Sequence, residues 1–327
     1  EVKFENITKK FNETVAVDNV SCTFEAGTLT TLLGPSGCGK TTSLRIIAGL
    51  ERATSGKILV DNEDVTLLPA TDRDVSMVFQ SYALFPHMSV LENVSYGLKM
   101  INVPKEEFTE KSLETLKLVN LEGYENRMPS ELSGGQQQRV AVARAIVLKP
   151  KVLLFDEPLS NLDAKLRRQV REDIREIQQK LGVTTIYVTH DQEEALAISD
   201  KVIVMNNAII AQQGSPKELY NFPKTKFVAN FIGDANVVKA EIINQNNNIY
   251  EIQLAEMKIN IESDQKLESS VSVSLRPEKI TISKSPEENS IHASVNNASF
   301  VGNSYQYIVN SKVGKIYVVS SDTNEIF

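Results

Sequence analysis

Residues 34–42 of this chain read GPSGCGKTT, a glycine-rich run that ends in a lysine and two threonines. The glycines let backbone N–H groups converge on a phosphate, and the helix that should follow adds a positive N-terminal end. Lys40 can bridge the β- and γ-phosphates, and the Thr41 hydroxyl is placed to bind Mg²⁺. An ordinary glycine turn is a poor alternative, because a strand-like run at 28–34 and a helix-like run at 40–50 flank the loop in the required order.

An acidic pair follows a second apolar run, VLLF at 152–155. Asp156 would lie at the C-terminal end of a buried strand, where open α/β sheets bind ligands. We predict that Asp156 holds Mg²⁺, directly or through water, and that Glu157 polarises the attacking water. Taken alone, such a pair is equally well a helix cap or a solvated turn. Beside a phosphate loop, the catalytic interpretation is favoured.

The segment LSGGQ at 132–136 suggests a second anion site. Ser133 and Gln136 have the spacing of a capping box, which predicts a helix that runs to about Leu148. Gly134 and Gly135 leave the first amides bare at the helix N-terminus. Without the other motifs, an ordinary capped helix after a glycine turn would be preferred. A nucleotide held by the phosphate loop already has one cradle, so a second makes sense if it closes on the γ-phosphate from the opposite side.

The elements that would position these residues read as an α/β domain up to about residue 235. Runs 151–155 and 184–189 are predicted to be buried strands, and Asp163 and Gly182 are predicted to cap a helix between them. Its apolar face would contain Leu166, Val170, Ile174, Ile177 and Leu181. Residues 81–150 read as a mostly helical insertion. There, Ser89 and Glu92 form a capping-box pattern, and Pro104 opens a second helix with Phe108, Leu113, Leu116 and Val119.

From residue 236 to 327 the pattern changes to alternating apolar positions, which is typical of half-buried strands. Examples are Val271, Val273 and Leu275, then Ile280 and Ile282, then Ile316 and Val318. The Asn-rich run 244–248 and Gly302 are typical of turns. This part of the chain is predicted to be a small all-β domain.

Composition narrows the function classes. The net charge is −7 over 327 residues, with no basic stripe of the kind that binds nucleic acid. No apolar run approaches the roughly 18–20 residues that cross a bilayer. Cys22 and Cys38 lie far apart, one of them inside the glycine loop, so we expect no disulfide and a reducing, cytosolic compartment.

Together with Gln80 after a strand, SNLD at 160–163 and His190, these motifs resemble the ATP-binding subunit of ABC transporters over about residues 1–235. The resemblance implies a P-loop NTPase fold, with a RecA-like α/β core and antiparallel β and helical subdomains. It implies that ATP contacts Phe11 and the loop residues Gly34, Pro35, Ser36, Gly37, Cys38, Gly39, Lys40, Thr41 and Thr42. It also implies that Gln80 contacts Mg²⁺ and the attacking water, and that His190 contacts the γ-phosphate. From the residues alone, Phe11 is equally well a core aromatic, and His190 could lie in a capped turn that starts a helix at Asp191.

In that family two subunits form a head-to-tail homodimer that encloses two ATP molecules. The resemblance therefore assigns to the partner subunit the residues Ser133, Gly134, Gly135, Gln136 and Asp163, with Asp163 communicating across the dimer.

Finer resemblances narrow the type. Residues 77–98 are similar to importer ATPases that serve binding-protein-dependent permeases. In those, a socket for a permease helix would include Ser81, Tyr82, Ala83, Leu84, Phe85 and Pro86, although these residues could equally form the core of the insertion. SLRPEKI at 274–280 resembles the C-terminal β-barrel domain (OB-like, TOBE type) of the maltose, iron(III), polyamine and sulfate subclass. The short tail favours ferric iron, a polyamine, or an oxyanion or phosphonate as the solute.

The function implied is an ATPase with ATP and Mg²⁺ as cofactors. It would be a peripheral subunit at the cytoplasmic face of the inner membrane, with a permease and an extracytoplasmic solute-binding protein as partners and no nucleic acid. A DNA-repair or translation ATPase of the same family is an alternative, but the chain shows no coiled-coil insertion and no second ATPase half. A nucleotide-gated scaffold is another, and intact Glu157 and His190 argue against it.

Overall fold

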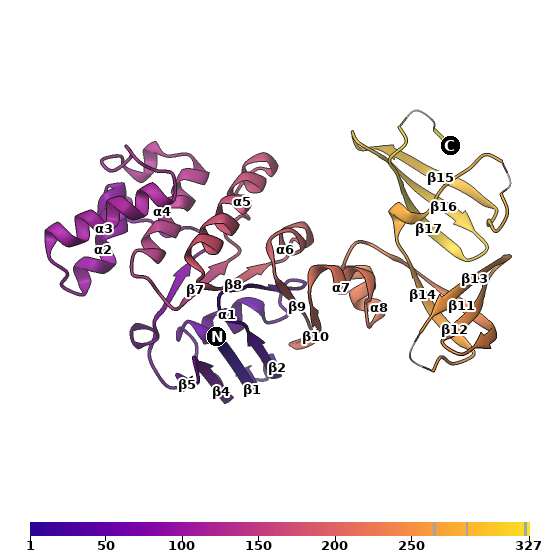
Figure 1. Cartoon of the computed structure of the whole chain (residues 1–327), viewed down its shortest axis with the longest axis horizontal. Helices are drawn as coiled ribbons and strands as arrows, with labels where there is room; N and C mark the ends of the chain where they lie inside the picture. Colours follow the sequence, from indigo (N-terminus) through magenta and orange to yellow (C-terminus); the bar gives the residue numbers. More distant parts are fainter. Residues whose placement is uncertain (264–265, 286, 324–325) are drawn as a thin grey trace. The chain divides into compact units, whose positions relative to one another are not determined.

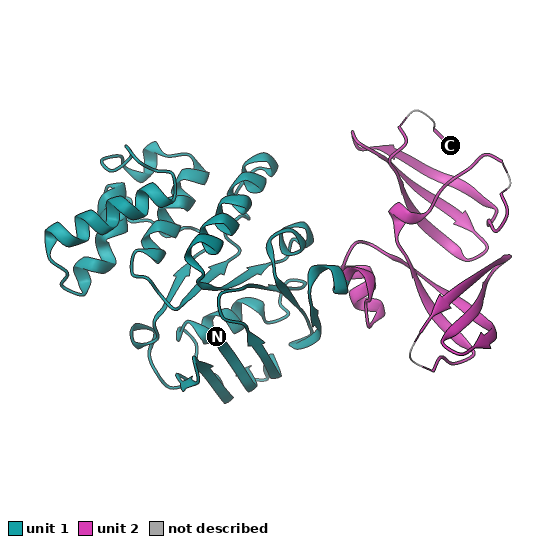
Figure 2. Ribbon diagram, in the orientation of Figure 1, with its two compact units in different colours: residues 1–219 teal, residues 220–327 magenta. Residues whose placement is uncertain are grey.

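The structure is a computed structural model that describes residues 1–263, 266–285, 287–323 and 326–327. It divides into two compact units, residues 1–219 and residues 220–327 (Figure 2). The division falls earlier in the chain than the domain boundary predicted after residue 235.

A mostly parallel six-stranded sheet forms the centre of the first unit. The strand order is β10-β9-β3-β8-β7-β6, and β10 alone runs antiparallel to its neighbour. The strands are β3 (Leu29–Leu33), β6 (Val75–Val78), β7 (Val152–Asp156), β8 (Thr184–Thr189), β9 (Lys201–Asn206) and β10 (Ile209–Gly214). Every residue of β3, β7 and β8 is buried, as expected of parallel strands covered on both faces.

Strands β3, β7 and β8 are each followed by a helix of the core. The helices are α1 (Lys40–Ile47), α5 (Ala164–Leu181) and α6 (Gln192–Ile198). The predicted caps of α5 are confirmed: the Asp163 side chain accepts from the Leu166 N–H, and Gly182 is left-handed with φ 60°. Helix α1 is shorter than predicted, because the chain leaves the helical region at Gly49, where φ is 74°.

A second, antiparallel sheet with the order β2-β1-β4-β5 completes the first unit. Its strands are β1 (Val2–Phe11), β2 (Thr14–Phe24), β4 (Ser55–Val60) and β5 (Glu63–Asp64), and a single 3₁₀ turn, η1 (Ala70–Asp72), follows. One apolar core joins this sheet to α1 and the parallel sheet, and another lies among β7, α4, α5 and the helical insertion.

The helical insertion groups its helices away from β9 and β10 (Figure 1). It contains α2 (Val90–Met100), α3 (Lys105–Leu118), the 3₁₀ turn η2 (Pro129–Glu131) and α4 (Gly134–Ile146). The capping boxes Ser89–Glu92 and Ser133–Gln136 are both present, as predicted. The prediction that Leu113 and Leu181 lie on buried apolar helix faces is wrong. Leu113 is 41% exposed, and Leu181, the last residue of α5, is 44% exposed.

The second unit is all-β apart from short helices, as predicted. Helix α7 (Pro216–Asn221) spans the division between the units, and α8 (Lys226–Phe231) follows it. Two antiparallel sheets, β13-β12-β11-β14 and β15-β16-β17, share one apolar core. They contain β11 (Asn236–Asn246), β12 (Ile249–Leu254), β13 (Met257–Glu262), β14 (Ser270–Leu275), β15 (Ala293–Phe300), β16 (Tyr305–Ser311) and β17 (Gly314–Ser320), with η3 (Pro277–Lys279) between β14 and β15.

One predicted strand is absent from this unit. Ile280 and Ile282 pack against the core without joining a ladder, because Pro277 starts a 3₁₀ turn and the segment after it is irregular. Within the described ranges, none of the helices combines the length and hydrophobicity needed to span a bilayer.

Candidate active site

The predicted site residues of the α/β core meet where β3, β7 and β8 end. These strands are neighbours and run parallel, so their C-terminal ends share one edge of the sheet. The phosphate loop follows β3, Asp156 is the last residue of β7 with Glu157 next to it, and His190 follows β8.

Close packing explains two glycines of the phosphate loop. A Cβ on Gly34 would lie 2.3 Å from the Met205 carbonyl oxygen, and one on Gly39 would lie 2.2 Å from the Ala16 carbonyl oxygen. Gly39 also has φ 103°, which disfavours any residue with a side chain. Because these glycines have no Cβ, the loop can pack directly against the backbone of β2 and β9.

Lys40 lies over the loop that it follows. Its side chain is buried, and its Nζ donates to the carbonyls of Gly34 at 2.8 Å and Pro35 at 2.9 Å. The ammonium group is therefore positioned at the mouth of the loop, where phosphate oxygens would replace these carbonyls as acceptors.

Thr41 and Asp156 form the predicted metal-binding pair. The Thr41 hydroxyl donates to Asp156 Oδ1 at 3.1 Å. Burial raises the pKa of Asp156, and the hydrogen bond from Thr41 opposes that rise. A hydroxyl and a carboxylate at this distance form an oxygen donor set of the kind that Mg²⁺ prefers. The residues present therefore fit the metal.

Glu157 and His190 face one another. His190 Nδ1 lies 3.1 Å from Glu157 Oε2, and the His190 side chain is more than half exposed. Glu157 has a left-handed backbone, with φ 44°, and its N–H donates to the Val188 carbonyl at 3.0 Å. The N-cap of α6 is the neighbouring Asp191, so His190 is not the capping residue of that helix.

Gln80 joins this group through Ser160 and Asn161 of the SNLD run, for which the sequence predicted no separate role. Its Nε2 donates to Ser160 Oγ at 3.0 Å, and the Ser160 hydroxyl donates to the Glu157 carbonyl at 3.1 Å. Asn161 Nδ2 donates to the Gln80 carbonyl at 3.1 Å. The signal for both was their place between Glu157 and Asp163, as two polar residues flanked by the buried Leu159 and Leu162.

Phe11 ends β1 and is 44% exposed, with Lys9 Nζ 4.6 Å from its ring centroid. The core-aromatic alternative is therefore wrong. Stacking on adenine stays a prediction.

The LSGGQ segment lies apart from the phosphate loop of its own chain. Among the described residues, no hydrogen bond or ion pair joins residues 133–136 to residues 34–42. The Ser133 hydroxyl accepts from the Gln136 N–H, and the glycines pack against the start of α5. A Cβ on Gly135 would lie 2.8 Å from Leu166 Cδ1. Asp163 is committed to capping α5.

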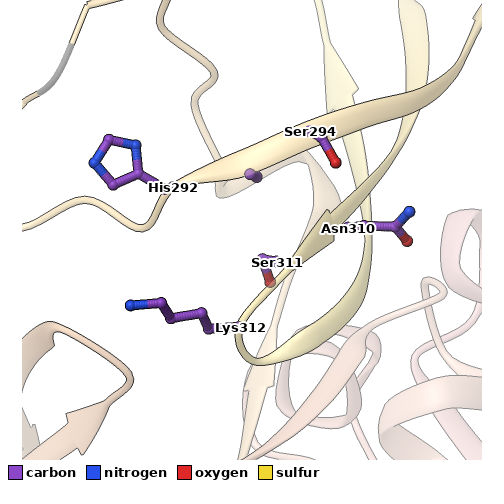
Figure 3. Close-up of a pocket in the computed structure, with 6 residues that line it drawn as sticks. His292, Ser294, Asn310, Ser311 and Lys312 are labelled. Carbon is purple, nitrogen blue, oxygen red and sulfur yellow. The ribbon is translucent and has the colours of Figure 1, made fainter.

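A shallow cavity of about 380 Å³ lies in the second unit, lined by His292, Ala293, Ser294, Asn310, Ser311 and Lys312 (Figure 3). None of the predicted site residues lines it. Lys312 Nζ is paired with Glu256, which offsets the charge that the cavity would otherwise offer an anion.

Two family models match the chain. The ABC transporter model matches residues 17–160, and the TOBE domain model matches residues 273–325.

Relatives cover nearly the whole chain. The Fe(3+) ions import ATP-binding protein FbpC of Agrobacterium fabrum is 52% identical over 323 residues, which are 99% of this chain and 91% of that protein. The protein of the same name from Rhizobium etli is 52% identical over 318 residues, which are 97% and 90% of the two chains.

Solved structures match about two thirds of the chain. MJ0796, a bacterial ABC transporter cassette solved as a dimer, is 32% identical with a TM-score of 0.59, over 66% of this chain and 99% of that chain. The cbiO1 protein of Clostridium perfringens, part of the transporter complex cbiONQ, is 31% identical with a TM-score of 0.62, over 67% and 89%.

Proposed function

This chain belongs to the ABC transporter family as the ATP-binding subunit of an importer, and from that premise we propose that the solute it helps to import is ferric iron. The observation that carries the proposal is the 52% identity to an Fe(3+) import ATP-binding protein over 99% of the chain. That match includes the C-terminal unit, and the motifs of ATP hydrolysis alone would not extend so far. The DNA-repair, translation and scaffold alternatives are not favoured.

The chain hydrolyses ATP with Mg²⁺. Lys40 and the loop amides would bind the phosphates, and Thr41, Asp156 and Gln80 would hold the metal. Glu157 would polarise the attacking water, with His190 beside it at the γ-phosphate. The 3.1 Å contacts between Thr41 and Asp156 and between Glu157 and His190 support these assignments.

The working unit in this proposal is a head-to-tail homodimer. Residues 133–136 and Asp163 of one copy would close on the nucleotide held by the phosphate loop of the other. The bare amides of Gly134 and Gly135 at the start of α4 support this, because they would form an anion site with no phosphate loop beside it in the same chain. The dimer would act as a peripheral subunit at the cytoplasmic face of the inner membrane.

Replacement of Glu157 by Gln tests the catalytic assignment. A glutamine keeps the size of the side chain but cannot accept a proton, so we expect kcat to fall by roughly 10²- to 10⁴-fold, the usual contribution of a general base. ATP affinity should change little, as judged by equilibrium binding. Near-normal hydrolysis by this variant would show that another group activates the water.

Reconstitution tests the solute. The chain would be combined with its permease in liposomes, and the matching solute-binding protein would be added loaded with Fe³⁺, with a polyamine or with a phosphonate. We expect ATP hydrolysis to be stimulated by the Fe³⁺-loaded protein. Stimulation by either of the other two solutes instead would overturn the iron assignment and leave the ATPase assignment intact.

A further inference from the structure

The backbone that carries Gln80 is held in an unfavourable conformation. Tyr82 and Ala83 both have positive φ angles, 60° and 49°, although neither is a glycine. Left-handed backbone is disfavoured for residues with a Cβ, and two in succession require outside support. We call residues 79–86 the Gln80 segment.

Arg144 supplies that support from the last turn of α4. Its Nη1 donates to the Ala83 carbonyl at 2.7 Å, and its Nη2 donates to the Tyr82 carbonyl at 2.9 Å. Its guanidinium lies 5.5 Å from the Phe85 ring centroid. The planar fork thus donates to the carbonyls of both left-handed residues at once, in a fixed geometry that a flexible ammonium group does not impose.

Two other side chains fix the ends of the same stretch. Asn161 donates to the Gln80 carbonyl at 3.1 Å. Asn93, fully buried on α2, accepts from the Phe85 N–H at 2.9 Å and donates to the Phe85 carbonyl at 3.1 Å. Arg144 is therefore the middle contact of three, and it acts where the backbone is strained.

Helix α4 has a different role at each end. It begins at Ser133 in the LSGGQ segment, and Arg144 lies eleven residues later, which is about 17 Å along the axis. A single rigid helix thus connects the segment that would contact the partner's nucleotide to the backbone beside Gln80.

We propose that Arg144 is a positioning residue of the ATPase site: it holds the Tyr82–Ala83 turn so that Gln80 is presented to the metal and the attacking water, and it ties that turn to the LSGGQ helix. The inference rests on the proposed function, in which Gln80 contacts Mg²⁺ and water. Arg144 is not among the residues assigned to ATP or the metal in that proposal, and its guanidinium donates to backbone carbonyls. Its loss should therefore affect turnover more than nucleotide binding.

The test compares two arginines of the same helix in the full-length chain. Arg144→Met removes both hydrogen bonds and keeps the packing of the stem. Arg139→Met is the control, because Arg139 is also half-buried on α4 but pairs with Asp173 of α5, at 2.6 Å. ATP hydrolysis would be measured against ATP and Mg²⁺ concentration, with the melting temperature of each variant.

For Arg144→Met we expect kcat to fall roughly ten- to hundredfold, since small misplacements of a catalytic group have effects of that size. The KM for ATP should stay within about twofold, and more Mg²⁺ should be needed for half-maximal rate. Arg139→Met should keep kcat within about twofold. Arg144→Lys, which keeps the charge and is less disruptive to folding, should fall between Arg144→Met and the wild type.

A second substitution tests the strain directly. Ala83→Gly removes the Cβ that disfavours the left-handed turn, so adding it to Arg144→Met should restore part of the lost kcat. An unchanged kcat in Arg144→Met, a loss in both arginine variants that follows only their melting temperatures, or no rescue by Ala83→Gly would overturn the positioning role. A wild-type chain without ATPase activity would instead overturn the proposed function, and the inference with it.

Discussion

At the scale of single residues, the phosphate loop depends on one cation. Replacing Lys40 with Ala removes a charged donor at the mouth of the loop, worth about 1.5–3 kcal/mol in typical charged hydrogen bonds. We therefore expect ATP affinity to fall by roughly ten- to hundredfold, measured by equilibrium binding of ATP. The same change in Lys57, an exposed residue of β4, should leave affinity unaltered. Equal affinity in both variants would exclude phosphate binding by Lys40.

Asp156 gives a pH-dependent prediction. Burial raises its pKa above that of the unfolded chain, so the folded protein is penalised when this carboxylate is ionised. The penalty is fully present above the folded-state pKa and disappears as the pH falls through it towards the unfolded-state value. Without Mg²⁺, Asp156→Asn should therefore stabilise the chain at neutral pH, and the gain should vanish in acid. Urea unfolding at several pH values measures this.

A gain from Asp156→Asn that grew on acidification would contradict the assigned direction. Thr41→Val is a useful companion, because it removes the hydrogen bond that opposes the shift and should raise the pKa of Asp156 further.

Sequence reasoning located the residues of the site that belong to short local patterns. Lys40, Thr41, Asp156 and Glu157 follow strands whose apolar runs are visible in the sequence, so the edge where they meet could be predicted. Arg144 could not be found in this way. It donates to the backbone carbonyls of Tyr82 and Ala83, about sixty positions away. Every residue has such a carbonyl, so the types of these two residues do not predict the contact.

At the scale of elements, close backbone contact between β1 and β4 depends on Gly56. It has φ 93°, and a Cβ there would lie 2.4 Å from the Asn6 carbonyl oxygen. Gly56→Ala should destabilise the first unit by about 3 kcal/mol, because both the left-handed backbone and the overlap must be relieved. Thermal unfolding of the full chain measures it.

Gly123 offers a matched control for that substitution. Its φ is 85°, but no atom lies within 4 Å of its ideal Cβ. Gly123→Ala should therefore show the backbone effect alone, about 1–2 kcal/mol. If the two variants were equally destabilised, crowding at β4 would have no part in the effect.

The helix ends of the first unit were easier to predict from the sequence than the strands of the C-terminal unit. Four residues cap helices through hydrogen bonds to residues three or four positions away, so a short stretch of sequence is enough to predict the helix end. They are Asp163, Gly182, Ser89 and Ser133. The alternation at Ile280 and Ile282 was misleading, because burial against a core does not require a partner strand. Whether a half-buried segment joins a ladder is decided by distant neighbours.

At the scale of the whole molecule, the two units have separate apolar cores and should unfold in separate transitions. Arg276 tests this. Its buried guanidinium donates to the carbonyls of Tyr220, Ala229 and Ile232 and stacks 4.0 Å from the Tyr220 ring centroid, all within the second unit. Arg276→Met leaves these carbonyls without their donor and should lower the stability of that unit by about 3 kcal/mol.

Calorimetry of the full chain would resolve the transitions. Arg276→Met should move one transition, and adding ATP with Mg²⁺ should move the other, because ligand stabilises the unit that binds it. Lys312→Met removes an exposed ion pair from the same unit and should change little. A single transition that responded to both changes would mean that the units unfold together.

The left-handed backbone of Glu157 lowers the stability of the folded chain at a residue that the proposed function requires. A glutamate is poorly suited to φ 44°, whereas glycine or asparagine adopts that conformation readily. The acid is nevertheless the residue proposed to activate water, so the chain is less stable than it could be at the position where turnover depends on it. A search for heat-resistant variants that scored folding alone would therefore be drawn towards replacements of Glu157, and would enrich for well-folded subunits that no longer power transport.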